Sequence, residues 1–349
     1  MAGKRHHYIP RFLQRGFLMG EPKKEYTYMY LNGGVQRRSK IDNVGVEGHF
    51  YSISGEAELD DIYTDLENTY SDIISKIKKF PLKKVDEVEL AEIISHFEVR
   101  TNNLRRSFYS SSKDFLDKMT ERFVSGDMLK SLIQNKIQQG VSNGGVFDDL
   151  FNQLSIPSQH REALFEHIRP MIEINIEGYI NSISEPIKFF FKEAINERLK
   201  TTIKRGHING MIRHVSKNAK LEDYKDLNYR VINTNFNLIL SDSVVIFDFE
   251  GLNEFKPFYD IKNTLKSVYL PISSNLFIYG TKDNSEPKLD ILNEMSAKCS
   301  SDFFIACDIS SDFSSLQGLI GQNCALLTDA EMKQILEEVI AEQMSQLYP

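Results

Sequence analysis

The chain lacks several features that would place it in a well-defined class. Its 349 residues contain no apolar run near the roughly 20 residues that a membrane span needs. The first residues lack the apolar segment of a secretory signal, so we expect a cytoplasmic protein with no membrane partner. Only three cysteines are present, and Cys299, Cys307 and Cys324 form no CxxC pair. This sparse set is typical of reduced thiols and argues against a disulfide framework or a zinc site.

Common catalytic motifs are missing as well. The sequence has no GxxxxGK[ST] phosphate loop, no GxSxG nucleophile elbow and no HExxH zinc motif. The glycine pair Gly33-Gly34 therefore does not mark a nucleotide site. No cofactor is identified, although a divalent metal stays compatible with carboxylates such as Asp248 and Glu250.

Charge is distributed unevenly along the chain. The formal net charge is −7, but residues 1–40 hold nine Lys or Arg against two Glu. This basic arm has a net charge of +7, so the other 309 residues carry −14. An acidic protein with one basic face can attract a polyanion locally. The alternative is that the basic arm neutralises an acidic region of the same molecule.

The hydrophobic pattern changes its period along the chain and predicts an α+β fold. Two β-prone runs at residues 26–31 and 35–40 surround Asn32-Gly33, which is typical of a hairpin. Apolar spacing is helical from residue 59 to 80 and again from 85 to beyond 108, and the run Phe189-Phe190-Phe191 is interpreted as the core of a buried helix. Further helices are expected at 127–139, 159–168, 186–204 and near 289–298, short strands at 229–232, 236–240, 244–249, 267–270, 276–279 and 303–306, and a closing helix at 329–347.

These elements predict an N-terminal β-hairpin, a central helical region and a C-terminal short-stranded sheet with a closing helix. We expect one domain over residues 1–349, with a basic arm and hairpin at 1–55, a helical region at 56–220 and a β-rich region at 221–349. Whether the N-terminal hairpin joins the C-terminal strands in one sheet is not decided by the sequence.

The most distinctive motif is the stretch that runs from His6-His7 through Pro10 and Leu13 to Phe17. It resembles the opening of the domain-of-unknown-function family 4238. Four further segments resemble that family in the same order: Phe97 to Thr101 followed by Arg105, Leu238 to Val245, Tyr269 to Ser273, and Leu292-Asn293. One departure is that Ser243-Val244 stand where the family has Asn-Pro, so the turn after Asp242 is expected to differ.

The resemblance implies a bacterial protein related to members found among antiviral defence genes. It therefore implies a defence effector or toxin, with a phage-derived trigger as one expected partner. This is an association between genes, and it does not identify a reaction.

The histidines of the N-terminal motif suggest acid–base chemistry. An imidazole that is neutral near pH 7 can activate a nucleophile against a phosphodiester, so we predict His7 as general base or acid. A His-x-x-Pro motif also loosely resembles the first element of His-Asn-His nucleases, but no second histidine with convincing spacing follows. The alternative is that His6 is solvated and His7 anchors the arm through backbone hydrogen bonds.

Arg100 is the second clue, because it falls on an apolar stripe with Phe97 and Leu104. A guanidinium in that position is costly unless it is paired or faces a polar pocket. We therefore predict either a phosphate clamp or a buried ion pair with a carboxylate such as Asp242. Asp242 and Asn293 are predicted to orient groups or bind metal.

Together these features predict a nuclease-type defence effector that attacks nucleic acid, RNA before DNA. Aromatic residues of the arm and hairpin would offer stacking surfaces, among them Tyr8 and Tyr30. The alternative is a non-catalytic sensor or interaction protein in which His7, Arg100 and Asp242 form a buried structural network. Residues predicted to bind the nucleic acid are His6, Arg11, Arg15, Arg37, Arg38 and Arg105.

Overall fold

The computed structural model describes residues 5–20, 24–52, 58–81, 85–125, 129–131, 133–134, 146–217 and 220–347. The chain divides into two compact units. The first unit comprises Met1–Ser110 with Thr202–Thr328, and the second comprises Ser111–Thr201 with Asp329–Pro349. Within the described residues, no helix is long and apolar enough to cross a membrane.

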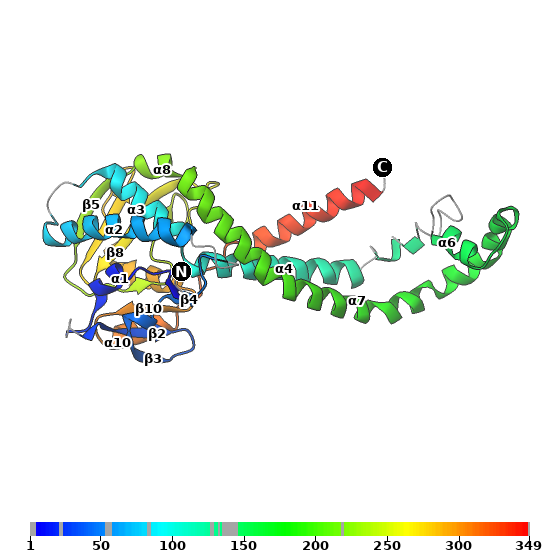
Figure 1. Cartoon of the computed structure of the whole chain (residues 1–349), viewed down its shortest axis with the longest axis horizontal. Coiled ribbons are helices and arrows are strands. Elements are labelled where there is room, and N and C mark those ends of the chain that lie inside the picture. Colours follow the sequence, from blue (N-terminus) through cyan, green and yellow to red (C-terminus); the bar gives the residue numbers. More distant parts are fainter. Residues whose placement is uncertain are drawn as a thin grey trace. The chain divides into compact units, whose positions relative to one another are not determined.

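Most of the elements belong to the first unit, and two long helices continue from it into the second (Figure 1). The first unit contains β1 (Arg5–His7), α1 (Arg11–Gln14), η1 (Arg15–Phe17), β2 (Tyr26–Leu31), β3 (Gln36–Lys40), η3 (Ile41–Asn43), β4 (Val46–Gly48), α2 (Glu58–Lys79), α3 (Glu87–Val99), α8 (Leu221–Lys225), β5 (Asn228–Asn233), β6 (Leu240–Ser241), β7 (Ile246–Phe249), β8 (Leu265–Ser273), β9 (Leu276–Thr281), η4 (Leu289–Ile291), α9 (Leu292–Cys299), β10 (Phe303–Ala306) and α10 (Ser311–Gln317). The second contains α6 (Val146–Gln153) and α11 (Asp329–Leu347), and both units share α4 (Asn102–Ser125) and α7 (Ser158–Ser216).

Three antiparallel sheets organise the first unit. Their strand orders are β1-β4, β3-β2-β10-β6 and β5-β9-β8-β7. Strand β2 of the predicted hairpin pairs directly with β10, so the N-terminal hairpin and a C-terminal strand lie in one sheet. At this junction Tyr30 lies opposite Phe304, and their rings stack with centroids 4.8 Å apart. The α+β prediction is therefore confirmed, and the open question of the hairpin is resolved.

The core of the first unit lies where helices meet these sheets. Helices α2, α3 and α8 gather beside the β5-β9-β8-β7 sheet (Figure 1). Helix α2 turns Tyr63, Tyr70 and Ile74 inward at helical spacing, and all three are buried. Tyr8 and Tyr30 are also buried, so neither presents a ring on which a base could stack.

Two helix predictions are wrong in their boundaries. The helix expected to run on from residue 85 beyond 108 ends at Val99, and α4 starts at Asn102. The Thr101 hydroxyl accepts the Leu104 backbone N–H at 3.3 Å, which is how a threonine begins a new helix. By contrast, the separate helices expected at 159–168 and 186–204 form one helix, α7. Pro170 and Pro186 lie inside this helix without ending it.

Three other predictions meet different outcomes. The Phe189-Phe190-Phe191 run is exposed on α7 rather than buried, with Phe190 69% exposed. Of the strand expected at 236–240, only Leu240 belongs to a strand, β6. The helix predicted at 127–139 lies mostly outside the described residues.

Candidate active site

A polar pocket of about 340 Å³ opens beside β1, α1 and α2 in the first unit. Its walls bring together residues of the N-terminal motif with two carboxylates of α2, Asp60 and Glu67. Phe12 of the motif lines it, and the basic side chains of the motif and arm that line it are Arg5, His6, His7, Arg11 and Arg15. Four of these five basic residues, all except Arg5, are predicted site residues.

The N-terminal motif folds as a strand that turns sharply into a short helix. Strand β1 pairs with β4, with His6 opposite Glu47 and His7 opposite Val46. Pro10 then precedes α1, where its fixed φ suits the start of a helix. The buried Gln14 amide donates to the backbone oxygens of Ile9 and Val44 and so fixes the turn.

Gly16 allows the N-terminal motif to pack closely against the later segment Tyr269–Ser273. A Cβ on Gly16 would lie only 2.2 Å from the backbone oxygen of Ile272 in β8. The Gly16 oxygen also accepts the Ser274 N–H at 2.9 Å. The motif therefore docks against the Tyr269–Ser273 segment through a contact that only glycine permits.

His6 is held through one of its ring nitrogens and by ring stacking. Its Nδ1 accepts the Tyr51 backbone N–H at 3.1 Å, so the ring proton lies on Nε2, which is 3.6 Å from Asp60 Oδ2. The ring is 4% exposed and stacks on Tyr51. His6 therefore anchors β1 against the Tyr51 segment.

His7 has the opposite arrangement. Its Nε2 lies 3.3 Å from the Ile41 carbonyl oxygen, and because a carbonyl only accepts, Nε2 must carry the proton. In the neutral ring Nδ1 then keeps its lone pair. Burial lowers the pKa of His7 below its usual 6.5, with a smaller contribution from the positive charge of Arg11. His7 is therefore neutral at pH 7 and can act as a base.

Arg100 lies directly behind the pocket, between α3 and α4 rather than within a helix. Its side chain is 0% exposed, and Nη2 donates to Glu67 Oε1 at 2.6 Å and also to the Tyr51 hydroxyl and the His7 carbonyl. Burial alone would lower the pKa of Arg100, but the Glu67 charge raises it above its usual value. The carboxylate that pairs with Arg100 is therefore Glu67, not Asp242.

A buried imidazole completes the setting of Arg100. Arg100 Nη1 donates to His96 Nε2 at 3.1 Å, and His96 is 2% exposed. Burial, followed by the charge of Arg100, lowers the pKa of His96 well below 6.5. Because Arg100 touches the His7 backbone and Glu67 at once, it positions pocket groups without reaching the pocket itself.

Two arginines of the basic arm are already paired within the chain. Glu25 accepts from Arg11 at 2.9 Å and from Arg15 at 2.7 Å, and Arg11 also lies 2.9 Å from Asp42. The hydrogen bond from Arg15, opposed by desolvation, lowers the pKa of Glu25. At these positions the arm neutralises acidic groups of its own molecule, as the alternative interpretation of the charge pattern expected.

The other predicted nucleic-acid-binding residues lie elsewhere. Arg37 and Arg38 are exposed on β3, and among the described residues neither forms an ion pair. Arg105 is 8% exposed, and its guanidinium contacts His207, Glu47 and the Phe50 oxygen. Arg105 is thus built into the interior of the first unit.

Asp242 and Asn293 lie outside the pocket and bond backbone groups. Asp242 accepts the N–H groups of residues 301, 302 and 303 at 2.7–3.3 Å. Burial raises the pKa of Asp242 to about 7, although these hydrogen bonds act to lower it. Asn293 accepts the Ile239 N–H at 3.1 Å and donates to the Asn237 oxygen at 2.8 Å. Both residues therefore fasten the chain around β6.

The turn after Asp242 has a backbone conformation that proline cannot adopt. Val244 has a φ of +64°, which is rare for a β-branched residue. A proline at this position is confined to a φ near −65°, so a chain with Asn-Pro here adopts another turn.

The sequence interpretation missed Glu67, Asp60 and Tyr51. A signal was present in α2, where Asp60, Thr64 and Glu67 recur at helical spacing on the face that lines the pocket. Among the described residues no group of three or more His, Cys, Asp or Glu side chains converges as metal ligands do. The pocket presents imidazole, carboxylate and guanidinium groups.

Comparison with known proteins identifies the family. Neither the curated proteins nor the solved structures contain a match to this chain. One family model matches residues 5–308, a stretch that includes the whole pocket, Arg100 and Asp242. The chain therefore belongs to the family described as "Protein of unknown function (DUF4238)".

Proposed function

We propose that the polar pocket cleaves RNA by transesterification, with His7 as the general base. The observation that carries this proposal is the state of His7: its proton is fixed on Nε2, its pKa is lowered, and it lines a pocket with three arginines. An imidazole with these properties accepts a proton at neutral pH.

The proposed step needs only groups that this pocket contains. His7 Nδ1 takes the proton of an RNA 2′-hydroxyl, the 2′-oxygen bonds to phosphorus, and the bond to the 5′-oxygen breaks. The 5′-oxygen takes a proton from water, and the product is a 2′,3′-cyclic phosphate. RNA is favoured over DNA because DNA has no 2′-hydroxyl to serve as the nucleophile.

The neighbouring residues would support the charges that develop. Arg5 and the partly exposed side chains of Arg11 and Arg15 line the pocket and would donate to phosphate oxygens. Glu67, held by Arg100, would stabilise the imidazolium of His7, since its charge already favours that form. Arg100 is a positioning residue in this scheme.

The cellular role that we propose is that of a bacterial defence effector or toxin acting in the cytoplasm. This part rests on the proposed RNA cleavage and on the resemblance to members found among antiviral defence genes.

The direct test uses purified full-length protein and total bacterial RNA in the presence of a chelator. We expect new 5′-hydroxyl and 2′,3′-cyclic phosphate ends, and a loss of at least about 100-fold in His7→Ala. The rate should rise with pH through the lowered pKa of His7 and level off above it. His160→Ala, an exposed histidine of the second unit, is the matched control and should cleave normally.

Three results would contradict the proposal. They are RNA left intact by folded protein with Mg²⁺, Mn²⁺ or chelator, cleavage that persists in His7→Ala, and equal cleavage of a 2′-O-methyl RNA that lacks the attacking hydroxyl.

A second candidate is a non-catalytic sensor in which these groups form a structural network. The complete burial of Arg100 and the pairing of Arg11 and Arg15 with Glu25 favour it. Under this alternative His7→Ala would weaken folding and alter no RNA. A folded, stable His7→Ala protein that has lost cleavage would instead support catalysis.

A further inference from the structure

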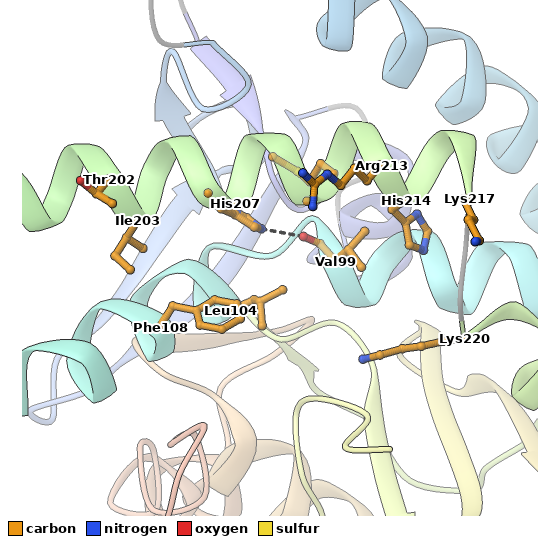
Figure 2. A pocket seen from close by; sticks show the side chains of 13 residues that line it. Val99, Leu104, Phe108, Thr202, Ile203, His207, Arg213, His214, Lys217 and Lys220 are labelled. Atoms are coloured by element: carbon orange, nitrogen blue, oxygen red, sulfur yellow. Dashed lines mark hydrogen bonds between the residues drawn. The ribbon is translucent and has the colours of Figure 1, made fainter. Parts of the chain in front are cut away.

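A second cavity in the first unit, of about 570 Å³, is independent of the polar pocket. It lies between the C-terminal end of α3, the first turns of α4 and the segment that runs from Thr202 in α7 to Lys217, just beyond the end of that helix (Figure 2). Its volume falls within the range of about 300–1,000 Å³ that small-molecule sites occupy. A ligand of matching size would fill it.

The wall of this cavity is mostly apolar. Leu104 and Phe108 project from α4 toward α7, where Ile203 faces them (Figure 2). Phe108 remains 38% exposed although it is a large apolar side chain. Such a surface gains free energy when an apolar ligand covers it.

Two glycines of α7 make room for the cavity. Gly206 and Gly210 lie one helical turn apart, and both line it. A Cβ built on either glycine would meet no atom within 4 Å. Neither glycine is therefore required by packing within the described residues, and both leave a groove along the helix.

Positive charge gathers at one end of the cavity. Arg213 lies in the last turn of α7 and Lys217 directly follows the helix, so both come from the end of the lining segment opposite Ile203. The Lys220 side chain extends into the cavity (Figure 2). Lys220 is neutralised by the buried Glu98 at 2.6 Å. Arg213 and Lys217 are exposed, and among the described residues neither forms an ion pair.

The two histidines of the wall do not add to this charge. His207 donates from Nε2 to the Val99 oxygen at 2.7 Å, and burial followed by the Arg105 charge lowers its pKa to about 3. His214 contacts the Ser95 hydroxyl at 2.8 Å, and burial lowers its pKa too. The charge that a ligand would meet is therefore that of Arg213 and Lys217.

We propose that this cavity binds a single-chain amphipathic anion, namely a free medium-chain fatty carboxylate. The carboxylate would contact Arg213 and Lys217, and the chain would lie over Gly206 and Gly210 against Leu104 and Phe108. Charge complementarity at one end and an apolar wall at the other select this ligand over a neutral or cationic amphiphile.

The test measures binding of decanoate to the full chain by isothermal titration calorimetry, below the micelle concentration. Decanol and decyltrimethylammonium have the same chain with no charge and a positive charge. We expect decanoate to bind at least about tenfold more tightly than either, because a hydrogen bond to a charged group contributes this much. The double variant R213Q/K217Q should remove the preference and leave decanol binding unchanged.

Filling the groove supplies an independent variant. Gly206→Leu places a side chain in open space on a helix that favours leucine over glycine, so the protein should fold and lose decanoate binding. Gly178→Leu lies on the same helix outside the cavity, also in open space, and should bind normally. The proposal is overturned if decanoate does not bind, if the cation binds as tightly, or if Gly206→Leu binds unchanged.

Discussion

The two compact units bury their apolar side chains to very different extents. In the first, a continuous buried cluster reaches from the N-terminal motif through α2 and α3 to the strands β7, β8 and β9. In the second, one cluster consists of Phe151, Phe165 and Ile176, while Ile174 and Phe190 are more than two-thirds exposed. The first unit therefore depends on long-range packing, and the second depends more on helix formation itself.

Ion pairs differ between the units in the same way. The first unit pairs buried Arg100 with Glu67, buried Glu98 with Lys220 and buried Asp248 with Lys288. In the second, Arg161 pairs with Asp148 of α6 while both side chains stay partly exposed, and Arg169 pairs with Glu166 and Glu173 one turn away on its own helix. Buried pairs across the fold fix a unique arrangement, whereas pairs within a helix add little to it.

The largest expected effect comes from breaking the most buried pair. Arg100→Ala strands Glu67 and leaves the Tyr51 hydroxyl and the His7 carbonyl without their donor, so it should cost about 3–5 kcal/mol of unfolding free energy. Arg169→Ala in the second unit should cost no more than about 0.5 kcal/mol. Urea unfolding gives both values, and a cost below about 1 kcal/mol for Arg100→Ala would contradict the account.

A comparable contrast is expected for phenylalanine. Phe277 is 0% exposed in β9, so Phe277→Ala should cost about 3–5 kcal/mol through the cavity that it leaves. Phe190 on α7 is 69% exposed, so Phe190→Ala should stay within about 0.5 kcal/mol. Hydrogen exchange measured by mass spectrometry resolves the units, and equal effects would show that Phe190 is covered in solution.

Acid should weaken the first unit through its buried histidines. The pKa of His207 is lowered to about 3 and that of His96 is lowered well below 6.5. Below a pH of about 6.5 the unfolded chain binds protons that the folded chain does not, so stability falls as the pH falls. Each histidine contributes a slope of up to about 1.4 kcal/mol per pH unit.

Asp242 acts in the opposite direction. Its pKa is raised to about 7, so between the unfolded and folded pKa values the folded chain holds the extra proton. The stabilisation from Asp242 is lost as the pH rises from about 4 to 7. This change in unfolding free energy opposes the change due to one of the two buried histidines. Urea unfolding between pH 7 and 5 gives the slope of unfolding free energy against pH. This slope should be shallower in His207→Gln than in wild type, and in His160→Gln it should equal that of wild type. An unchanged slope in His207→Gln would contradict this account.

The smallest effect concerns helix propensity, where the units should agree. Gly178 in the second unit and Gly206 in the first both lie on α7, and an added Cβ meets no atom within 4 Å. Gly→Ala at either position should raise stability by about 0.5–1 kcal/mol in thermal unfolding. Gly16→Ala, which clashes with the Ile272 oxygen, should lower it. A loss of stability at Gly178 or Gly206 would indicate a packing role for that glycine.

Local patterns in the sequence predicted elements well where one signal dominates. The strand Phe303–Ala306 and the helix Asp329–Leu347 have the predicted bounds. The pairing of β2 with β10 was not predictable, because it joins segments that lie far apart in the chain. The break between α3 and α4 was missed because the apolar stripe continues across it, while a single threonine caps the new helix.

For the candidate site, the sequence predicted several residues that the fold brings to one pocket, but not all of their contacts. His6, His7, Arg11 and Arg15 line one pocket, and the arginine on an apolar stripe, Arg100, is indeed buried and paired. Its partner Glu67 looks like any carboxylate on an exposed helix face until the tertiary fold brings α2 against β1. Asp242 and Asn293 belong to strand ends whose backbone partners are set by distant segments.

The proposed catalytic role of His7 is tested most directly in cells. Wild type, His7→Ala and the control His160→Ala would be induced to matched soluble levels, and RNA ends would be sequenced. The account predicts new 2′,3′-cyclic phosphate ends at discrete sites in wild type and in His160→Ala, and none in His7→Ala. The same ends in His7→Ala, or toxicity of wild type with all RNA intact, would contradict it.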